Sequence, residues 1–326
     1  MPYMETGTDI KKAAFIIRNG GLVAFPTETV YGLGANGLDP IAVAKIFAVK
    51  QRPSFDPLIL HVGNHGMAGE LLARPDDPVV QRLMHHFWPG PLTIVAQKQN
   101  IVPDIVTSGM ATVAVRMPDN PFALELIREA GVPVAAPSAN LFGRLSPTRP
   151  QHVSKQLKGV DYLVEGGQTR IGLESTIVSV GSHGLRLLRP GQITLDQIMD
   201  AIPGITVCSG ESWEDNNKVQ APGQLKSHYS PEKPLYIFNH LPAGLHASSG
   251  VILFKEPAGR LIPAVQTIIL SPSGDLLEAA ANLFTALHDM ENNPLISEIH
   301  IQAVEEKGIG VAMMDRIRKA AYRHQS

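Results

Sequence analysis

Two cations, Lys50 and Arg52, stand at the predicted end of a helix over residues 41–49. Proline at position 53 disfavours helical geometry in the residue before it, so both cations face the following loop. Arginine binds phosphate oxygens bidentately and lysine adds a compact charge, which indicates a phosphate clamp. The alternative is a solvated pair that complements the helix dipole, and for this motif alone that arrangement is the more common one.

A second group of polar side chains follows the strand predicted at 132–136. Ser138 and Asn140 come directly after this strand, and Ser146 follows soon after. Ligands of α/β folds bind at the carboxyl ends of strands, where hydroxyl, amide and backbone N–H groups can donate to phosphates. An ordinary Ser/Asn turn is about as common, so both interpretations stay open for this motif alone.

Arg116 lies between valine and methionine on a strand predicted at 112–116, and Thr112 shares its face. A buried arginine needs an anion, which is either a structural carboxylate or a carboxylate or phosphate of a ligand. We weigh these two equally. His61, in the strand predicted at 58–62, is more often a hydrogen-bonded sheet histidine than a ligand.

Arg189 adds a further cation before a Pro-Gly turn, and we expect it to be exposed. Several common motifs are missing from the sequence: GxxxxGK[ST], GxGxxG after a strand, HExxH and GxSxG. Their absence weakens the P-loop, dinucleotide-binding, zincin and hydrolase hypotheses. His85 and His86 are adjacent rather than spaced along one helix face, which argues against a metal site there.

These candidate residues require a sheet to hold them. Helical spacing predicts helices at 10–18, 41–49 and 121–130. Short apolar runs predict strands at 22–25, 58–62, 92–96, 112–116, 132–136, 162–164 and 176–180. The pattern favours an α/β domain with a largely buried sheet.

The composition changes after about residue 205, and the stretch 209–234 is polar with no sustained period. We predict three parts: a catalytic domain at 1–208, a linker or lid at 209–234, and a smaller α/β domain at 235–326. In the last part we expect strands at 235–238, 250–254, 267–270 and 299–303 and helices at 275–290 and 312–321.

The composition is that of a globular protein, with 44% hydrophobic and 18% charged residues and a net charge of −2. This balance argues against a general attraction to nucleic acid or anionic membranes. The single cysteine, Cys208, fits a reducing compartment. Because the N-terminus is polar and the apolar runs are short, the sequence predicts a cytoplasmic protein without membrane insertion.

Nine short motifs occur in order along the chain. They are FPTETVYGLG at 25–34, KQRP at 50–53, PL at 57–58, WPGPLT at 88–93, VRMP at 115–118, PSAN at 137–140, SPT at 146–148, GLESTIV at 172–178 and LRPG at 188–191. Together they resemble the YrdC-like family. The segment APGQLKSHYSP at 221–231 and the C-terminal extension resemble the two-domain threonylcarbamoyl-AMP synthases. The resemblance implies a twisted mixed sheet with helices around a concave cleft, followed by a smaller Rossmann-like α/β domain.

The resemblance also implies an activity. The enzyme would be a nucleotidyltransferase that joins L-threonine, bicarbonate and ATP into threonylcarbamoyladenylate and releases pyrophosphate, with Mg²⁺ accompanying ATP. The product would pass to a separate tRNA threonylcarbamoyl transferase machinery, which makes N6-threonylcarbamoyladenosine at position 37 of ANN-decoding tRNAs.

The same resemblance implies site residues. Lys50 and Arg52 would act in catalysis, and the residues implied for ATP are Lys50, Arg52, Asp56, Thr112, Ser138, Asn140, Ser146, Arg189 and Tyr229. Those implied for threonine are Thr29, His61, Arg116, Ala136 and Thr176. No protein ligand for a metal is implied. Related sequences often carry asparagine near position 56, so a contact of Asp56 with ATP through Mg²⁺ and no contact at all both stay open.

Two other functions compete with this one. An RNA-binding module would show salt-dependent binding without turnover; the net charge argues against it, and weak RNA binding at a local patch stays open. Carbamoyl transfer to another acceptor, as in hydrogenase-maturation carbamoyltransferases, is disfavoured because zinc-finger and acylphosphatase-like segments are missing. The long stretch 209–234 is typical of a lid, and we expect it to close over the cleft.

Overall fold

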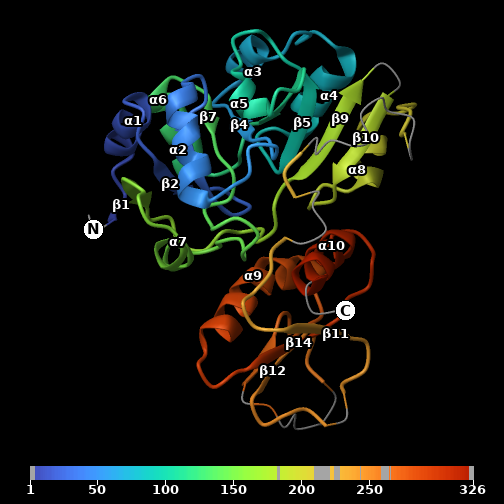
Figure 1. Cartoon of the computed structure of the whole chain (residues 1–326). Coiled ribbons are helices and arrows are strands. Elements are labelled where there is room, and N and C mark those ends of the chain that lie inside the picture. The colour runs from blue at the N-terminus through green and yellow to red at the C-terminus, as the bar shows by residue number, and fades with distance from the viewer. Residues whose placement is uncertain are drawn as a thin grey trace.

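The strands that the structure describes form two sheets, which Figure 1 shows in two bodies placed end to end. The computed structural model describes residues 4–181, 184–208, 221–223, 228–242, 244–257, 264 and 266–322. The larger body is the blue-to-yellow part of the chain in Figure 1, and the smaller body is the orange and red part.

The larger sheet has ten strands among the described residues, in the order β1-β8-β2-β3-β7-β4-β6-β5-β9-β10. Their bounds are β1 (Glu5–Gly7), β2 (Val23–Pro26), β3 (Tyr31–Asn36), β4 (Ile59–His61), β5 (Leu92–Gln97), β6 (Thr112–Arg116), β7 (Val134–Ala135), β8 (Tyr162–Val164), β9 (Thr176–Gly181) and β10 (Gly184–Arg189). The sheet is mixed, since β4 pairs with β6 in parallel whereas β2 pairs with β3 in antiparallel orientation. β2, β4 and β8 are buried along their whole length, which explains their continuous apolar sequences.

The helices of the larger body include α2, which carries the first candidate residues. Their bounds are α1 (Ile10–Arg18), α2 (Pro40–Lys50), α3 (His65–Leu71), α4 (Pro78–Phe87), α5 (Asp104–Thr107), α6 (Pro121–Ala130), α7 (Pro150–Gln156) and α8 (Leu195–Ala201). The carboxylate of Asp39 caps the N-terminus of α2, where Pro40 needs no hydrogen-bond partner. The helix ends at Lys50 because Gln51 adopts a left-handed conformation with φ 52°.

The smaller sheet is parallel, in the order β11-β14-β12-β13. Its elements are β11 (Leu235–Phe238), β12 (Ser249–Leu253), β13 (Gln266–Ile269), β14 (Glu298–Gln302), α9 (Leu276–Asn292) and α10 (Gly310–Ala321). In Figure 1, α9 and α10 lie between this sheet and the larger body. One hydrophobic cluster joins both bodies, because Leu145 and Leu173 of the larger body belong to the same cluster as Phe284 of α9. The two bodies therefore share a core.

The fold class predicted from the sequence is confirmed: a large mixed sheet is followed by a smaller parallel one. β3 was not predicted, because its sequence YGLGAN contains two glycines, which are weak strand formers. The boundaries at 208, 209–234 and 235 stay a prediction, and residues 209–220 and 224–227 of the predicted linker lie outside the described residues. In the described parts of the chain, no helix has both the length and the apolar character needed to cross a membrane.

Candidate functional site

A cavity lies where the ends of β4, β6 and β7 meet the loop after β2, the loop before β9 and residues 222–223 and 228–229. Its walls are formed by Thr27, Thr29, Val30, Gly32, Arg52, Ile59, His61, Arg116, Ala136, Pro137, Ser138, Glu174, Ser175, Arg189, Pro222, Gly223, His228 and Tyr229. Polar and cationic side chains from distant parts of the sequence thus converge on one cavity.

Lys50 joins the end of α2 to the loop that follows β7. Its ammonium group donates a hydrogen bond of 2.5 Å to the carbonyl of Ser138 and another to the carbonyl of Asn140. Lys50 is only 1% exposed, so the alternative of a solvated C-terminal pair is wrong. Burial and the neighbouring cation Arg52 lower the pKa of Lys50 well below its ordinary value.

Arg52 is held by its own loop. Its guanidinium forms an ion pair of 2.9 Å with the carboxylate of Asp56 and donates hydrogen bonds to the carbonyls of Asp56 and Pro57. Burial raises the pKa of Asp56, while the charges of Arg52 and Lys50 act in the opposite direction. Asp56 therefore orients Arg52, and Arg52 lines the cavity.

Arg116 pairs with a carboxylate that the sequence did not single out. Its guanidinium lies 2.5 Å from the Glu28 carboxylate and donates to the hydroxyl of Thr29 at 3.0 Å. The structural carboxylate expected as one of the two partners is thus present, yet Arg116 also lines the cavity. Nearby, burial lowers the pKa of His61 to about 3, so this ring is neutral at ordinary pH.

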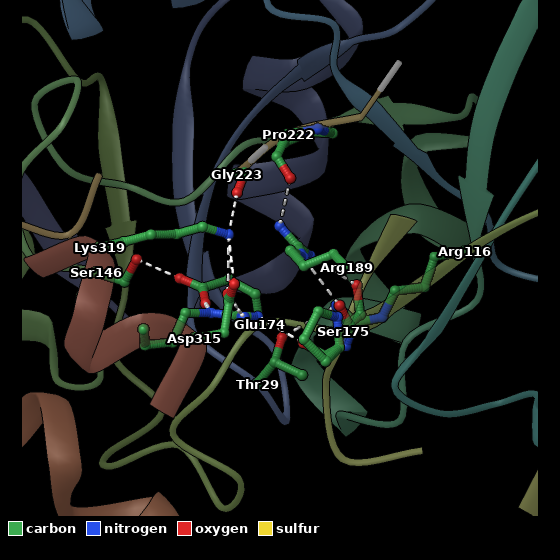
Figure 2. A network of polar contacts seen from close by, with 12 residues as sticks. Thr29, Arg116, Ser146, Glu174, Ser175, Arg189, Pro222, Gly223, Asp315 and Lys319 are labelled. Atoms are coloured by element: carbon green, nitrogen blue, oxygen red, sulfur yellow. Dashed lines mark hydrogen bonds and ion pairs between the residues drawn. The ribbon is translucent and has the colours of Figure 1, made fainter. Parts of the chain in front are cut away.

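Arg189 is 4% exposed, so the expectation of an exposed cation is wrong. It ends β10 and donates to the carbonyl and hydroxyl of Ser175 at 3.0 and 3.1 Å and to the carbonyl of Pro222 at 3.1 Å (Figure 2). Gly223 allows this close approach: its φ is 82°, and a Cβ there would lie 2.6 Å from the Tyr229 hydroxyl. Arg189 thereby fastens residues 222–223 to the larger body.

Glu174 links the cavity to the smaller body. Its carboxylate accepts hydrogen bonds from the hydroxyl of Ser146 and from the guanidinium of Arg316 on α10. Figure 2 shows Glu174 beside Ser175 and reaching toward Ser146. Burial would raise the pKa of Glu174, but the charges of Arg316 and Arg189 prevail and lower it.

The structure brings most of the predicted site residues together. Those that line the cavity are Thr29, Arg52, His61, Arg116, Ala136, Ser138, Arg189 and Tyr229. A second group supports the walls through contacts with lining residues: Lys50, Asp56, Asn140 and Ser146. Their roles toward ATP or threonine stay predictions.

Two predicted residues lie apart from the cavity walls. Thr112 begins β6, at the end opposite Arg116, and pairs with Gln97 of the neighbouring strand. Thr176 begins β9, and its hydroxyl donates to the carbonyl of Ile193 at 2.6 Å.

Sequence reasoning did not select Glu28, Glu174, His228 or Arg316. Glu28 lies in the motif FPTETVYGLG and Glu174 lies in GLESTIV. An acidic residue within a largely apolar motif is unusual, and this could have marked both as candidates. His228 and Tyr229 pack ring against ring at 4.0 Å. Within the described residues, no group of three or more His, Cys, Asp or Glu side chains could hold a metal ion.

Comparisons with known proteins show which family the chain belongs to. The Sua5/YciO/YrdC family model, described as "Telomere recombination", matches residues 15–191, and a model described as "Threonylcarbamoyl-AMP synthase, C-terminal domain" matches residues 193–322. The threonylcarbamoyl-AMP synthase of Pyrococcus abyssi is 40% identical, with 96% of this chain and 94% of that protein covered. The Bacillus subtilis enzyme of the same name is 41% identical, with 96% and 92% covered.

A solved structure is similar over the whole chain. The crystal structure of P. abyssi Sua5 complexed with L-threonine has a TM-score of 0.84 and 35% identity, and it covers 99% of this chain and 98% of that one. With both family models matched in order, the chain belongs to the Sua5/YciO/YrdC family, in its two-domain form with the C-terminal domain of threonylcarbamoyl-AMP synthases.

Proposed function

We propose that this chain condenses L-threonine, bicarbonate and ATP into L-threonylcarbamoyladenylate and pyrophosphate. The observation that carries the proposal is the cavity itself, which Arg52, Arg116 and Arg189 all line. A site of this kind can hold the carboxylate of an amino acid beside the phosphates of a nucleotide. The names of the relatives and the threonine in the P. abyssi complex support the same assignment.

At the amino-acid end, the Arg116 guanidinium is the group suited to the threonine carboxylate, because it is cationic, fixed by Glu28 and placed beside the Thr29 hydroxyl. His61 is neutral there, so it offers hydrogen bonds without competing for the carboxylate. Ala136, with its small side chain in the same wall, leaves room for the ligand.

At the nucleotide end, Lys50 is bonded to the carbonyls of Ser138 and Asn140, and these residues together with Arg52 would form the phosphate site. The threonine ammonium first loses a proton to solvent, and the free amine then adds to the carbon of bicarbonate with loss of water, which gives an N-carboxylate. A carboxylate oxygen then attacks the α-phosphorus, and the bond from this phosphorus to pyrophosphate breaks. Cations and hydroxyls stabilise the developing charge, so no protein nucleophile is needed.

Mg²⁺ enters this proposal as a companion of ATP. It would supply positive charge that offsets part of the charge on the phosphates. Lys50 and Arg52 would bind the remaining phosphate charge. The Asp56 carboxylate is already paired with Arg52.

Residues 222–223 and 228–229 support the hypothesis of a lid. They line the cavity, and Pro222 and Gly223 accept hydrogen bonds from Arg189 and from Lys319 of α10. As a lid, this segment would open to admit ATP and then close to exclude water from a labile adenylate. If a chain lacking the lid and the C-terminal body kept full turnover and ATP affinity, this role would be wrong.

The product is proposed to serve tRNA modification. A mixed anhydride of a carbamate and AMP is an activated acyl donor, so a transferase must move its threonylcarbamoyl group to an acceptor. We assign that acceptor to the adenosine at position 37 of ANN-decoding tRNAs, reached through a separate transferase machinery. A cytoplasmic location would fit this partner.

The test is pyrophosphate release from ATP by the full chain. Release should require both L-threonine and bicarbonate, and mass spectrometry should find the threonylcarbamoyladenylate. If neither substrate stimulates release in a folded sample, the proposal fails. Salt-dependent RNA binding without turnover would favour the RNA-binding alternative.

A further inference from the structure

Arg316 of α10 is the largest fully buried side chain among the described residues. Burying a guanidinium removes it from water, which is costly unless charge and hydrogen bonds replace the lost hydration. Arg316 has both charge partners and hydrogen-bond acceptors in place of water. It donates to the Glu174 carboxylate at 2.8 Å, to the Asp315 carboxylate at 2.6 Å and to the Pro190 carbonyl at 3.0 Å. Its guanidinium also lies over the Tyr229 ring at 5.3 Å.

Three of these four partners belong to the walls of the cavity or adjoin them. Glu174 and Tyr229 line the cavity, and Pro190 directly follows Arg189. A residue of the C-terminal body thus makes contacts that surround the nucleotide end of the site. The Asp315 carboxylate also pairs with the ammonium group of Lys319 at 2.7 Å, so it would keep a cationic partner if Arg316 were replaced.

The buried acids of the site have separate arginine partners. Asp56 pairs with Arg52, Glu28 pairs with Arg116, and Glu174 pairs with Arg316. Arg189 differs, since its hydrogen bonds within the described part of the chain go to neutral oxygens of Ser175 and Pro222.

Glu174 is close enough to Arg189 for their charges to interact. A buried carboxylate without a partner attracts the nearest cation strongly, because the interior screens charges weakly. If Arg316 were lost, Arg189 would be the cation in the cavity wall available to Glu174. An Arg189 drawn to Glu174 would give up its hydrogen bonds to Ser175 and Pro222 and would no longer be placed for the phosphates.

We propose that Arg316 is a positioning residue of the ATP site: by pairing with Glu174 it keeps the charge of Arg189 available to the nucleotide. This inference rests on the proposed function in one respect, since it takes the phosphates of ATP as the anion that Arg189 meets. It makes α10 a required part of the nucleotide site, which gives the C-terminal body a role in binding as well as in stability.

The decisive comparison is between Arg316→Met and the double variant Arg316→Met/Glu174→Gln. Methionine keeps an apolar contact with Tyr229 while removing the charge, and glutamine keeps an acceptor for the Ser146 hydroxyl. Arg318→Met is the matched control, because Arg318 is on the same helix but its ion pair with Glu306 is about half exposed. All four chains would be titrated calorimetrically with α,β-methylene-ATP and Mg²⁺, with L-threonine titrated separately.

We expect Arg316→Met to raise the dissociation constant of the nucleotide by about 10-fold or more, the effect of one lost charge-assisted contact. The double variant should return to within about 3-fold of the wild type, and threonine affinity should stay within about 2-fold throughout. Arg318→Met should match the wild type.

Unchanged nucleotide affinity in folded Arg316→Met would overturn the inference. Equal losses in the single and double variants would also overturn it, because they would mean that Arg316 acts by packing alone. If Arg316→Met fails to fold, Arg316→Gln takes its place in the same comparison, because glutamine keeps a donor for the Pro190 carbonyl while removing the charge. Because binding is measured without turnover, a wild type that binds the nucleotide but releases no threonine-dependent pyrophosphate would refute the proposed function and leave this inference tested.

Discussion

The ammonium group of Lys50 donates a hydrogen bond of 2.5 Å to the backbone carbonyl of Ser138, 88 positions later in the sequence. Together with the bond from Lys50 to the carbonyl of Asn140, it fixes the loop after β7 to the end of α2. The motifs KQRP at 50–53 and PSAN at 137–140, each of which has an ordinary explanation on its own, are therefore joined by hydrogen bonds in the fold.

Lys50→Met should weaken both ATP use and the loop. Methionine fills a similar volume but donates no hydrogen bond, so two buried carbonyls lose their partner, and the phosphate site loses a charge. We expect kcat/KM for ATP to fall by about 100-fold, as two charge-assisted contacts of this kind are removed. Steady-state pyrophosphate release against ATP concentration measures this.

A matched control uses Lys45, which lies on the same helix and donates to the Gly20 carbonyl away from the cavity. Lys45→Met should leave kcat/KM for ATP within about 2-fold of the wild type. If Lys50→Met behaved like Lys45→Met, Lys50 would have no part in nucleotide use.

Arg116→Ala should raise the KM for threonine sharply while the KM for ATP changes little. The substitution also leaves Glu28 as an unpaired buried carboxylate, which costs about 3–5 kcal/mol of stability. Arg116→Gln/Glu28→Gln removes both charges and should be folded more stably than Arg116→Ala. The threonine KM of this double variant should still rise by about 10-fold or more. A threonine KM equal to that of the wild type would remove Arg116 from the amino-acid site.

The strands with continuous apolar sequences could be predicted because they depend on local sequence, whereas β3 with its two glycines could not. Leu92 to Ala96 and Thr112 to Arg116 are continuous β-rich runs, and the structure has strands there. The partners of the buried charges could not be predicted. Glu28 and Arg116 are 88 positions apart and Glu174 and Arg316 are 142 apart, so only the fold decides which acid meets which arginine. Arg189 was expected to be exposed for the same reason, since its cover comes from residues 222–223 far along the chain.

Tyr229→Phe should separate function from stability. The Tyr229 side chain is 1% exposed, and its hydroxyl oxygen has no hydrogen-bond partner within the described part of the chain. Burial raises the pKa of Tyr229, so the hydroxyl stays protonated and can donate to a ligand. Removing an unsatisfied buried hydroxyl should leave the melting temperature unchanged or higher. The KM for ATP should rise by about 2- to 10-fold if the hydroxyl binds the nucleotide, and an unchanged KM would show that it does not.

His152 of α7 and His288 of α9 stack across the two bodies, with ring centroids 3.8 Å apart and planes at 22°. His152 Nδ1 accepts a hydrogen bond from the Thr148 N–H at 3.2 Å. His288 Nε2 lies 3.1 Å from the Ser146 carbonyl, to which it donates. Because His152 Nδ1 accepts a hydrogen bond, this nitrogen carries no proton in the folded state and the His152 ring is neutral.

This pair predicts acid sensitivity. Burial lowers the pKa of His152 to about 3, with His288 as a further cause, and burial lowers the pKa of His288 to about 4, whereas both lie at 6.5 in a model peptide. Between pH 6.5 and about 4 the unfolded chain thus binds more protons than the folded one, so the free energy of unfolding falls as pH falls. Above pH 6.5 the pair contributes no slope.

At pH 5 the expected loss is about 2 kcal/mol for each histidine, from about 1.4 kcal/mol per pH unit below the unfolded pKa. Urea unfolding at pH 7.5 and pH 5.0 measures the difference, provided that unfolding is reversible and the two bodies melt together. His288→Gln keeps a donor for the Ser146 carbonyl and has nothing to titrate, so the pH-dependent loss should shrink by about 2 kcal/mol. His86→Gln, at an exposed position of α4, is the control and should keep the full loss. If His288→Gln and the wild type lose the same free energy of unfolding between pH 7.5 and pH 5.0, His288 does not contribute to the acid sensitivity, and other groups cause it.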